Sequence, residues 1–221
     1  MRRFEVEFAA LNNTLMEMGS MVAQSIHRGV HALVERNAES AYHVRRDEGR
    51  IDECDIRVDS MAASLIALEQ PVASDMRLVV AAIKISTDLE RMGDLALNIA
   101  TRALSLMDSP ELPVPIVLTD IARLVESMVL RSLEAFVQRD ALIAREVLAS
   151  DHGVDNMRAA IQDQVVRLMK SDPDSVERAL DHLVAARSLE RIADHARNIA
   201  EGVIYLVEGV DVRHMTAALS S

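Results

Sequence analysis

Apolar side chains recur at intervals of three and four residues over most of the chain, which is the period of an amphipathic α-helix. The pattern is clear between Leu89 and Leu106, where apolar residues stand at positions 89, 92, 96, 99, 103 and 106. Proline-containing breaks interrupt it at 70–74, 108–113 and 171–174, and softer breaks lie near 37–38 and 139–140. The pattern predicts an all-α protein with six long helices, at about 4–37, 40–69, 75–107, 114–138, 141–171 and 175–208.

The second half of the chain repeats the first. Residues 89–100 read LERMGDLALNIA and residues 189–200 read LERIADHARNIA, which are identical at eight of twelve positions. Upstream of each segment, residues 48–52 (EGRID) match residues 151–155 (DHGVD). The first match has an offset of 100 residues and the second an offset of 103, so the proline turns between the two motifs must absorb the difference.

This duplication predicts the domain organisation. We expect two tandem three-helix bundles, one in residues 1–109 and one in residues 110–221, joined near Pro110 and Pro113. The repeat leaves open whether the two bundles stand apart or share a core.

The composition excludes several classes of protein. Half of the 221 residues are hydrophobic, but glycine, proline and aromatic residues are scarce, which suits helices and not an all-β protein. The net charge of −11 argues against a general nucleic-acid-binding protein and leaves room for cationic partners, including metal ions. Cys54 is the only cysteine, as expected in a reducing compartment. No apolar stretch is long enough to span a membrane or resembles a secretory signal, so we expect a cytoplasmic protein.

Acidic pairs spaced four residues apart lie within the repeated segments: Glu48/Asp52, Glu90/Asp94, Asp151/Asp155 and Glu190/Asp194. This spacing puts both carboxylates of a pair on one helix face, close enough to share a cation. Their oxygen atoms suit Mg, Mn and Fe, and carboxylates also occur at Zn sites. The spacing alone is weak evidence, because chance placement of 35 acidic residues in 221 gives nearly as many such pairs.

The position of the pairs is better evidence. In the first half the two motifs are equidistant from Pro71, and in the second half from the Asp172–Pro173 turn. Because an α-helix rises about 1.5 Å per residue, an antiparallel hairpin would bring both motifs to the same height. Each half would then present four carboxylates from two neighbouring helices, for a metal ion or for ion pairs. The rival partners are arginines in or beside the motifs: Arg91, Arg187 and Arg191.

Two asparagines and two arginines are candidates for supporting roles. Asn98 and Asn198 extend the acidic stripes by one helical turn, where they could hydrogen-bond to the ligands or between helices. Arg91 and Arg191 lie inside the motifs, next to the carboxylates.

The sequence lacks the motifs of the enzyme classes that its composition allows. It contains no Glu-x-x-His motif, no P-loop, no dinucleotide-binding glycine motif and no nucleophile elbow. His195 adjoins Asp194, but Leu95 takes its place in the other copy, which disfavours a role as a ligand. We therefore expect a protein without catalytic residues.

Three features together resemble the PhoU family of phosphate-signalling regulators: residues 70–77 (QPVASDMR), the two LER(M/I)xD…NIA segments and the half-to-half duplication. The resemblance covers nearly the whole chain. It implies two three-helix bundles in a cytoplasmic protein that is peripheral to the inner membrane and often dimeric. It also implies contacts with the ATPase subunit of the phosphate ABC transporter and with a phosphate-sensing histidine kinase. Through these contacts PhoU-like proteins keep the phosphate-starvation response off when phosphate is plentiful.

The resemblance further implies multinuclear binding of divalent or trivalent metal ions, with Fe, Zn, Mn and Mg as candidates. Carried over to this sequence, the ligands are Glu48, Asp52, Glu90 and Asp94 in the first half and Asp151, Asp155, Glu190 and Asp194 in the second. The second copy departs from the first, since Asp151 reaches less far than a glutamate and Ala193 replaces Gly93. The two sites could therefore differ in affinity or nuclearity.

Two alternatives stay open at this point. A carboxylate-rich helical bundle could instead store metal or carry out redox chemistry, although the missing Glu-x-x-His motifs disfavour a di-iron version. The acidic pairs could also be surface or ion-pair features that hold no metal.

Overall fold

The computed structural model describes residues 3–212, which form six α-helices, one short 3-10 helix and no strand. Their bounds are α1 Arg3–Val34, α2 Ala38–Glu69, α3 Ala73–Ser105, α4 Thr119–Gln138, α5 Ala141–Ser171, η1 Pro173–Ser175 and α6 Val176–Glu208. The prediction of an all-α protein with six long helices is confirmed. None of these helices combines the length and the apolar character that a membrane span requires.

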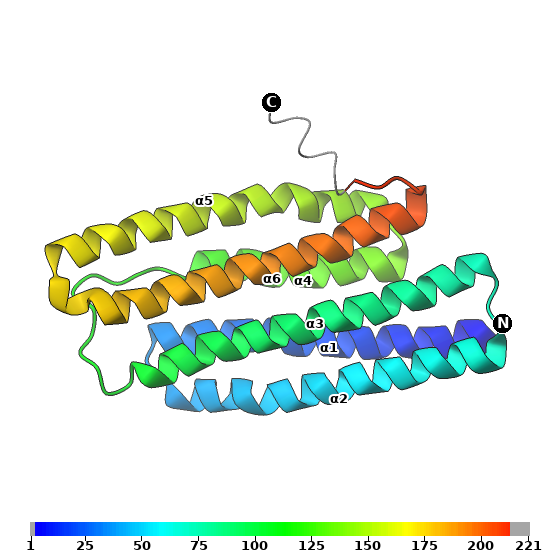
Figure 1. Ribbon diagram of the computed structural model, residues 1–221, viewed down its shortest axis with the longest axis horizontal. Coiled ribbons are helices and arrows are strands. Elements are labelled where there is room, and N and C mark those ends of the chain that lie inside the picture. Colours follow the sequence, from blue (N-terminus) through cyan, green and yellow to red (C-terminus); the bar gives the residue numbers. More distant parts are fainter. Residues whose placement is uncertain (1–2, 213–221) are drawn as a thin grey trace.

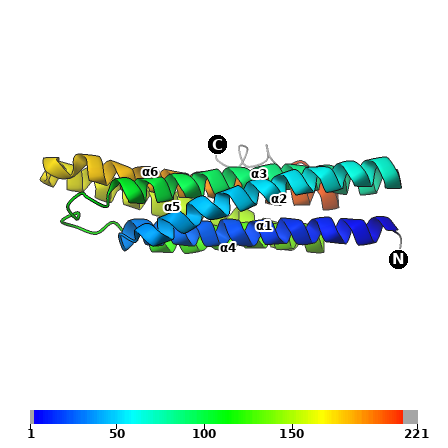
Figure 2. The same ribbon diagram turned by 90° about the horizontal axis from the view of Figure 1, so that it is seen from below.

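The helices form two three-helix bundles that lie side by side along the long axis of the molecule (Figure 1). Helices α1, α2 and α3 pack together in the first bundle, and α4, α5 and α6 in the second. Between the bundles, α3 packs against α6 and α1 against α4, and Figure 2 shows α1 and α4 on the same side of the molecule. Buried apolar side chains from all six helices belong to one continuous core. The two bundles therefore share a core and do not stand apart.

The two copies use the same turn between their first and second helices. Arg36 and Arg139 adopt left-handed backbone conformations, with φ of 51° and 55°, and end α1 and α4. The next residues, Asn37 and Asp140, cap α2 and α5 by accepting hydrogen bonds from backbone N–H groups of the first turn, at 2.9 and 2.7 Å. Equivalent positions in these helices are thus 103 residues apart.

The linker between α3 and α4 is longer than predicted. Helix α4 begins at Thr119, so the predicted start near residue 114 is wrong by five residues. Pro113 and Pro115 explain the difference, because proline disfavours a helical conformation in the residue before it and has no N–H to donate. Ile116 and Leu118 are instead buried in the core as part of a non-helical segment that leads into α4.

Two arginines hold this linker by its main-chain carbonyl groups. The Arg36 guanidinium donates to three carbonyl oxygens at 2.7, 2.7 and 2.5 Å, those of Leu106, Met107 and Ser109. The Arg178 guanidinium donates to the carbonyl oxygens of Pro110 and Glu111, at 3.0 and 3.1 Å. The linker therefore covers one end of the contact between the two bundles.

The close approach of α1 to α3 depends on Gly29. A Cβ atom at this position would lie 3.2 Å from the main-chain oxygen of Ala96 and 3.4 Å from the side chain of Ile99. A backbone oxygen cannot give way without moving its helix. Gly49, on an exposed face of α2, would meet nothing within 4 Å.

Replacing Gly29 with leucine is expected to lower the free energy of unfolding by about 1–3 kcal/mol, because the side chain forces α1 away from α3. The matched change Gly49→Leu is expected to be neutral or to stabilise by up to about 1 kcal/mol, because leucine favours a helix over glycine. Urea denaturation followed by circular dichroism measures both changes. Equal stabilities for the two variants would contradict the packing described for α1 and α3.

Candidate functional site

The four predicted ligands of the first half lie near one another on adjacent faces of α2 and α3. Burial raises the pKa of Glu48, and the carboxylates of Asp52 and Asp94 raise it further. Burial also raises the pKa of Glu90, and Asp94 and Asp52 again add to the effect. Because these influences cross from one helix to the other, the hairpin brings the two acidic motifs to the same height.

Asp55 is a further member of this group. Its carboxylate contributes to the raised pKa of Asp52 and of Glu90, after the larger effects of burial and of Asp94. It also accepts a hydrogen bond from Ser86 Oγ at 2.7 Å, which holds it close to α3. We call five residues the acidic cluster: Glu48, Asp52, Asp55, Glu90 and Asp94. Asp55 lies outside the repeated motifs and is not one of the predicted ligands.

No ion pair within residues 3–212 neutralises the acidic cluster. Within residues 3–212, none of its members forms a salt bridge. Arg45 and Arg91 lower the pKa values of Glu48 and Glu90, but burial and the neighbouring carboxylates outweigh them. The cluster therefore concentrates negative charge on one face of the first bundle.

In the second bundle, arginines pair with the corresponding carboxylates. Arg197 Nη1 donates to Asp151 Oδ2 at 3.0 Å, and this hydrogen bond is the main cause of the raised pKa of Arg197. Arg158 Nε lies 3.2 Å from Glu190 Oε1. Burial raises the pKa of Asp194, and Arg197 offsets part of that rise. The guanidinium groups of Arg158 and Arg197 thus lie next to these carboxylates.

Neither arginine has a counterpart in the first half. At the offset of 103 residues that relates α2 to α5, Asp55 stands where Arg158 stands. At the offset of 100 residues that relates α3 to α6, Leu97 stands where Arg197 stands. The same scaffold therefore carries an unneutralised acidic cluster in one copy and an arginine-paired set in the other. A position-by-position comparison of the two copies could have found this difference from sequence.

The residues predicted to support the site lie at the surface. Arg91 and Arg191 are exposed and form no salt bridge in the part of the chain that the structure describes. Arg187 is also exposed and forms no salt bridge in that part of the chain. The carboxylates of the second bundle therefore pair with Arg158 and Arg197, and not with the arginines considered from sequence. Asn98 and Asn198 are also exposed, and the side chain of neither forms a hydrogen bond within residues 3–212.

His195 contacts a carboxylate of the first bundle. Its Nδ1 atom lies 2.8 Å from Asp88 Oδ1 on α3, and both side chains are largely buried. This contact joins the second bundle to the first.

The two copies differ in how well they suit a metal ion. Within residues 3–212, no three His, Cys, Asp or Glu side chains converge closely enough to hold one. The acidic cluster still offers the oxygen donors that hard cations prefer, on two adjacent helices and without an arginine to displace. Binding would need side-chain rotations that draw the carboxylates of α2 and α3 together. In the second bundle a cation would first have to displace Arg158 and Arg197.

Charge removal is expected to have opposite effects in the two copies of the metal-free protein. Asp52→Asn should raise the free energy of unfolding at pH 7 by about 0.2–0.5 kcal/mol, because it relieves repulsion between like charges. Asp151→Asn should lower it by up to about 1 kcal/mol, because Arg197 loses one of its two carboxylate partners. Urea denaturation in the presence of a chelator measures both changes.

The pH dependence provides a control for this prediction. The pKa of Asp52 is raised in the folded protein, so folding binds protons and the wild type loses stability as pH rises through that pKa. The advantage of Asp52→Asn should therefore shrink as the pH falls towards the range in which Asp52 is protonated. An advantage that stays constant between pH 7 and pH 4 would contradict the electrostatic cause.

Comparisons with known proteins agree with this architecture. The PhoU domain model matches twice, over residues 15–103 and 118–203. The chain is 38% identical over 215 residues to the phosphate-specific transport system accessory protein PhoU homolog of Pseudomonas aeruginosa, which covers 97% of this chain and 89% of that protein. It is 31% identical over 213 residues to the phosphate-specific transport system accessory protein PhoU of Escherichia coli K12, covering 96% of this chain and 88% of that protein.

Solved structures share the whole fold. The crystal structure of PhoU from Pseudomonas aeruginosa matches with a TM-score of 0.89 and 37% identity, covering 94% of this chain and all of that one. The phosphate transport system regulatory protein PhoU from Streptococcus pneumoniae matches with a TM-score of 0.86 and 28% identity, covering 95% of this chain and 99% of that one. Both halves of the sequence and the fold that they form show that this chain belongs to the PhoU family.

Proposed function

We propose that this chain is a regulatory adaptor in phosphate homeostasis, which negatively regulates phosphate uptake and the phosphate-starvation response. The observation that carries the proposal is the similarity, over nearly the full length, to proteins named as accessories of phosphate-specific transport. The relative of known structure from Streptococcus pneumoniae is described as a regulatory protein of phosphate transport. Because the relatives are named for accessory and regulatory roles, a protein that acts by binding is favoured over an enzyme.

The proposed partners are the ATPase subunit of the phosphate ABC transporter and a phosphate-sensing histidine kinase. An adaptor must present surfaces in a fixed relation to each other, and a single close-packed core through both bundles supports that requirement. The proposal places the protein in the cytoplasm, at the periphery of the inner membrane, where such partners expose their soluble parts. It also includes a homodimer as the working form.

We further propose that the acidic cluster binds divalent or trivalent metal ions, with Fe, Zn, Mn and Mg as candidates. Glu48, Asp52, Glu90 and Asp94 would supply the carboxylate oxygens, and a bound ion would supply positive charge that joins α2 to α3. Support comes from the raised pKa values in this cluster, which are caused first by burial and then by repulsion between neighbouring carboxylates that a cation would relieve. The second set, Asp151, Asp155, Glu190 and Asp194, would bind more weakly because of its arginines.

The adaptor role is tested by co-purification at high phosphate. The tagged chain is expected to retain the transporter ATPase subunit and the sensor kinase when each is co-expressed with it, and to leave an unrelated ABC ATPase unbound. In cells, deletion of the gene should switch on phosphate-starvation genes in rich phosphate, and the wild-type chain should switch them off again. Retention of neither partner, together with normal repression in the deletion strain, would refute the adaptor.

The metal proposal is tested by thermal unfolding of chelator-treated protein. Adding Mn, Fe, Zn or Mg is expected to raise the melting temperature, since an ion that binds only the folded state stabilises it by about 2.7 kcal/mol at 100 times its dissociation constant. The double variant Asp52→Asn/Asp94→Asn should lose most of this shift.

The matched control is Asp155→Asn/Asp194→Asn in the second bundle, which should keep most of the shift. Elemental analysis of protein purified without chelators gives the number of ions per chain. No bound metal and no shift with any of the four ions would favour a purely structural role for the carboxylates. Many ions per chain, or turnover in a ferroxidase assay, would favour the storage or redox alternative.

A further inference from the structure

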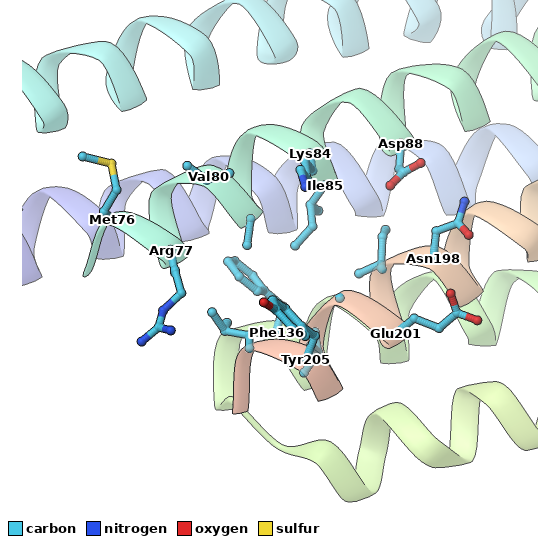
Figure 3. A pocket seen from close by; sticks show the side chains of 15 residues that line it. Met76, Arg77, Val80, Lys84, Ile85, Asp88, Phe136, Asn198, Glu201 and Tyr205 are labelled. Atoms are coloured by element: carbon cyan, nitrogen blue, oxygen red, sulfur yellow. The ribbon is translucent and has the colours of Figure 1, made fainter. Parts of the chain in front are cut away.

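A groove with a volume of about 440 Å³ lies between the two bundles and is lined by side chains of α3, α4 and α6 (Figure 3). Phe136 forms part of its floor, and Val80 and Tyr205, which are 42% and 53% exposed, form apolar parts of its rim. Arg77 and Lys84 add two basic side chains from α3. We call this hollow the interbundle groove.

At the opposite end of the contact between α3 and α6, the corresponding position is covered by the chain itself. There, Leu33 and Leu106 stand at the positions that Phe136 and Leu206 occupy in the interbundle groove, at the offsets of 103 and 100 residues. The linker between α3 and α4 passes over them, and its Ile116 is only 4% exposed. The hollow that remains at the covered end has about half the volume, about 240 Å³. The scaffold therefore already binds one non-helical segment at this type of position.

The interbundle groove has small residues where the covered end has a salt bridge. At the covered end, Arg102 on α3 lies 3.4 Å from Asp181 on α6. The equivalent residues at the open end are Gly202 and Ala81, and both line the groove. A Cβ atom at Gly202 would meet nothing within 4 Å. The groove thus has room for a side chain that this chain does not provide at that position.

The open end also carries an arginine that lacks a partner. At the covered end, Arg36 binds three main-chain carbonyl groups of the linker. Its counterpart is Arg139, which has the same left-handed backbone and follows Phe136 at the end of α4. Within residues 3–212, the Arg139 guanidinium forms no hydrogen bond or salt bridge. A donor for main-chain carbonyl groups of a bound segment is therefore available beside the groove.

The charges of the groove favour an acidic occupant. Its two acidic side chains are paired within the chain, Glu201 with Arg197 at 3.5 Å and Asp88 with His195 at 2.8 Å. Arg77 and Lys84 form no ion pair in the part of the chain that the structure describes. Within residues 3–212 the rim therefore offers two basic groups without an ion-pair partner, although the chain as a whole carries −11. A carboxylate on an incoming segment would complement it.

We propose that the interbundle groove binds a non-helical segment of a partner protein, one that carries apolar side chains and at least one carboxylate, as the linker does at the covered end. Apolar side chains of the segment would fill the space over Phe136 and beside Gly202, and Arg139 would bind its carbonyl groups. The inference gives the proposed adaptor a partner-binding surface and rests on that function for its biological role. It does not depend on which protein supplies the segment.

The probe is a fluorescent peptide with the sequence of linker residues 107–117, which contains two carboxylates and the apolar side chains that cover the equivalent end. Titration of the full-length protein is expected to give saturable binding with a dissociation constant below about 1 mM. Ala81→Asp/Gly202→Arg, which copies the salt bridge of the covered end into the groove, is expected to weaken binding at least tenfold. Gly49→Arg is the matched control on an open helix face and should bind like the wild type.

A charge exchange keeps the test informative if the double variant folds poorly. Lys84 is exposed, so Lys84→Glu should leave the fold intact. It is expected to weaken binding of the acidic peptide at least threefold, and to improve binding of a peptide in which the two acids are lysines. Circular dichroism confirms that each variant is folded.

Several outcomes would overturn the proposal. These are no saturable binding of the peptide, equal binding by the wild type and both groove variants, or binding only after residues 213–221 are removed, which would make the chain's own end the occupant. A change from dimer to monomer in the groove variants, measured by sedimentation, would make a second copy the occupant. Because the test uses an isolated peptide, its failure would leave the adaptor role itself to the co-purification experiment.

Discussion

The packing of α3 against α6 is the constraint on which the rest of the structure depends. Each of these two helices contacts both other helices of its own bundle and also its counterpart in the other bundle. A helix with three neighbours keeps only a narrow exposed stripe, and apolar or small side chains must occupy the remainder. On α3 that stripe includes Arg91, Asp94 and Asn98, which are exposed between buried neighbours. The carboxylates of Glu90 and Asp94 therefore lie along the edge that faces α2.

The duplication has been kept where packing requires it and has diverged where it does not. Leu89 and Leu189 are fully buried, as are Ile99 and Ile199, because core volume is costly to change. Around the carboxylates, Asp55 in one copy corresponds to Arg158 in the other, and the helices remain the same. Surface positions tolerate such a reversal of charge, and the two copies consequently have different electrostatics on one scaffold.

Sequence predicted the helices and the duplication well because both depend on periodic patterns within single segments. The position of the carboxylates along the helix axes was also predictable, because a helical hairpin fixes distances along its axis. Side-chain contacts between neighbouring helices were not predictable in the same way. The pairing of Arg158 with Glu190 depends on how α5 is rotated against α6, which neither helix encodes alone. The start of α4 was misplaced because the burial of Ile116 and the carbonyl contacts of Arg36 belong to tertiary structure, which outweighs local helix propensity.

The positions of the two candidate sites on α3 add a further physical consequence. Lys84 lines the interbundle groove, and Glu90 lies less than two turns further along the same helix, in the acidic cluster beside α2. Between them Asp88 contacts His195 and ties α3 to α6. A close-packed helix moves as a unit, so a cation that drew α2 towards α3 would act on the wall of the groove as well. If both proposals hold, any effect of the cation on binding in the groove must be matched by an equal effect of the bound segment on the affinity for the cation, because coupling between two binding equilibria is reciprocal.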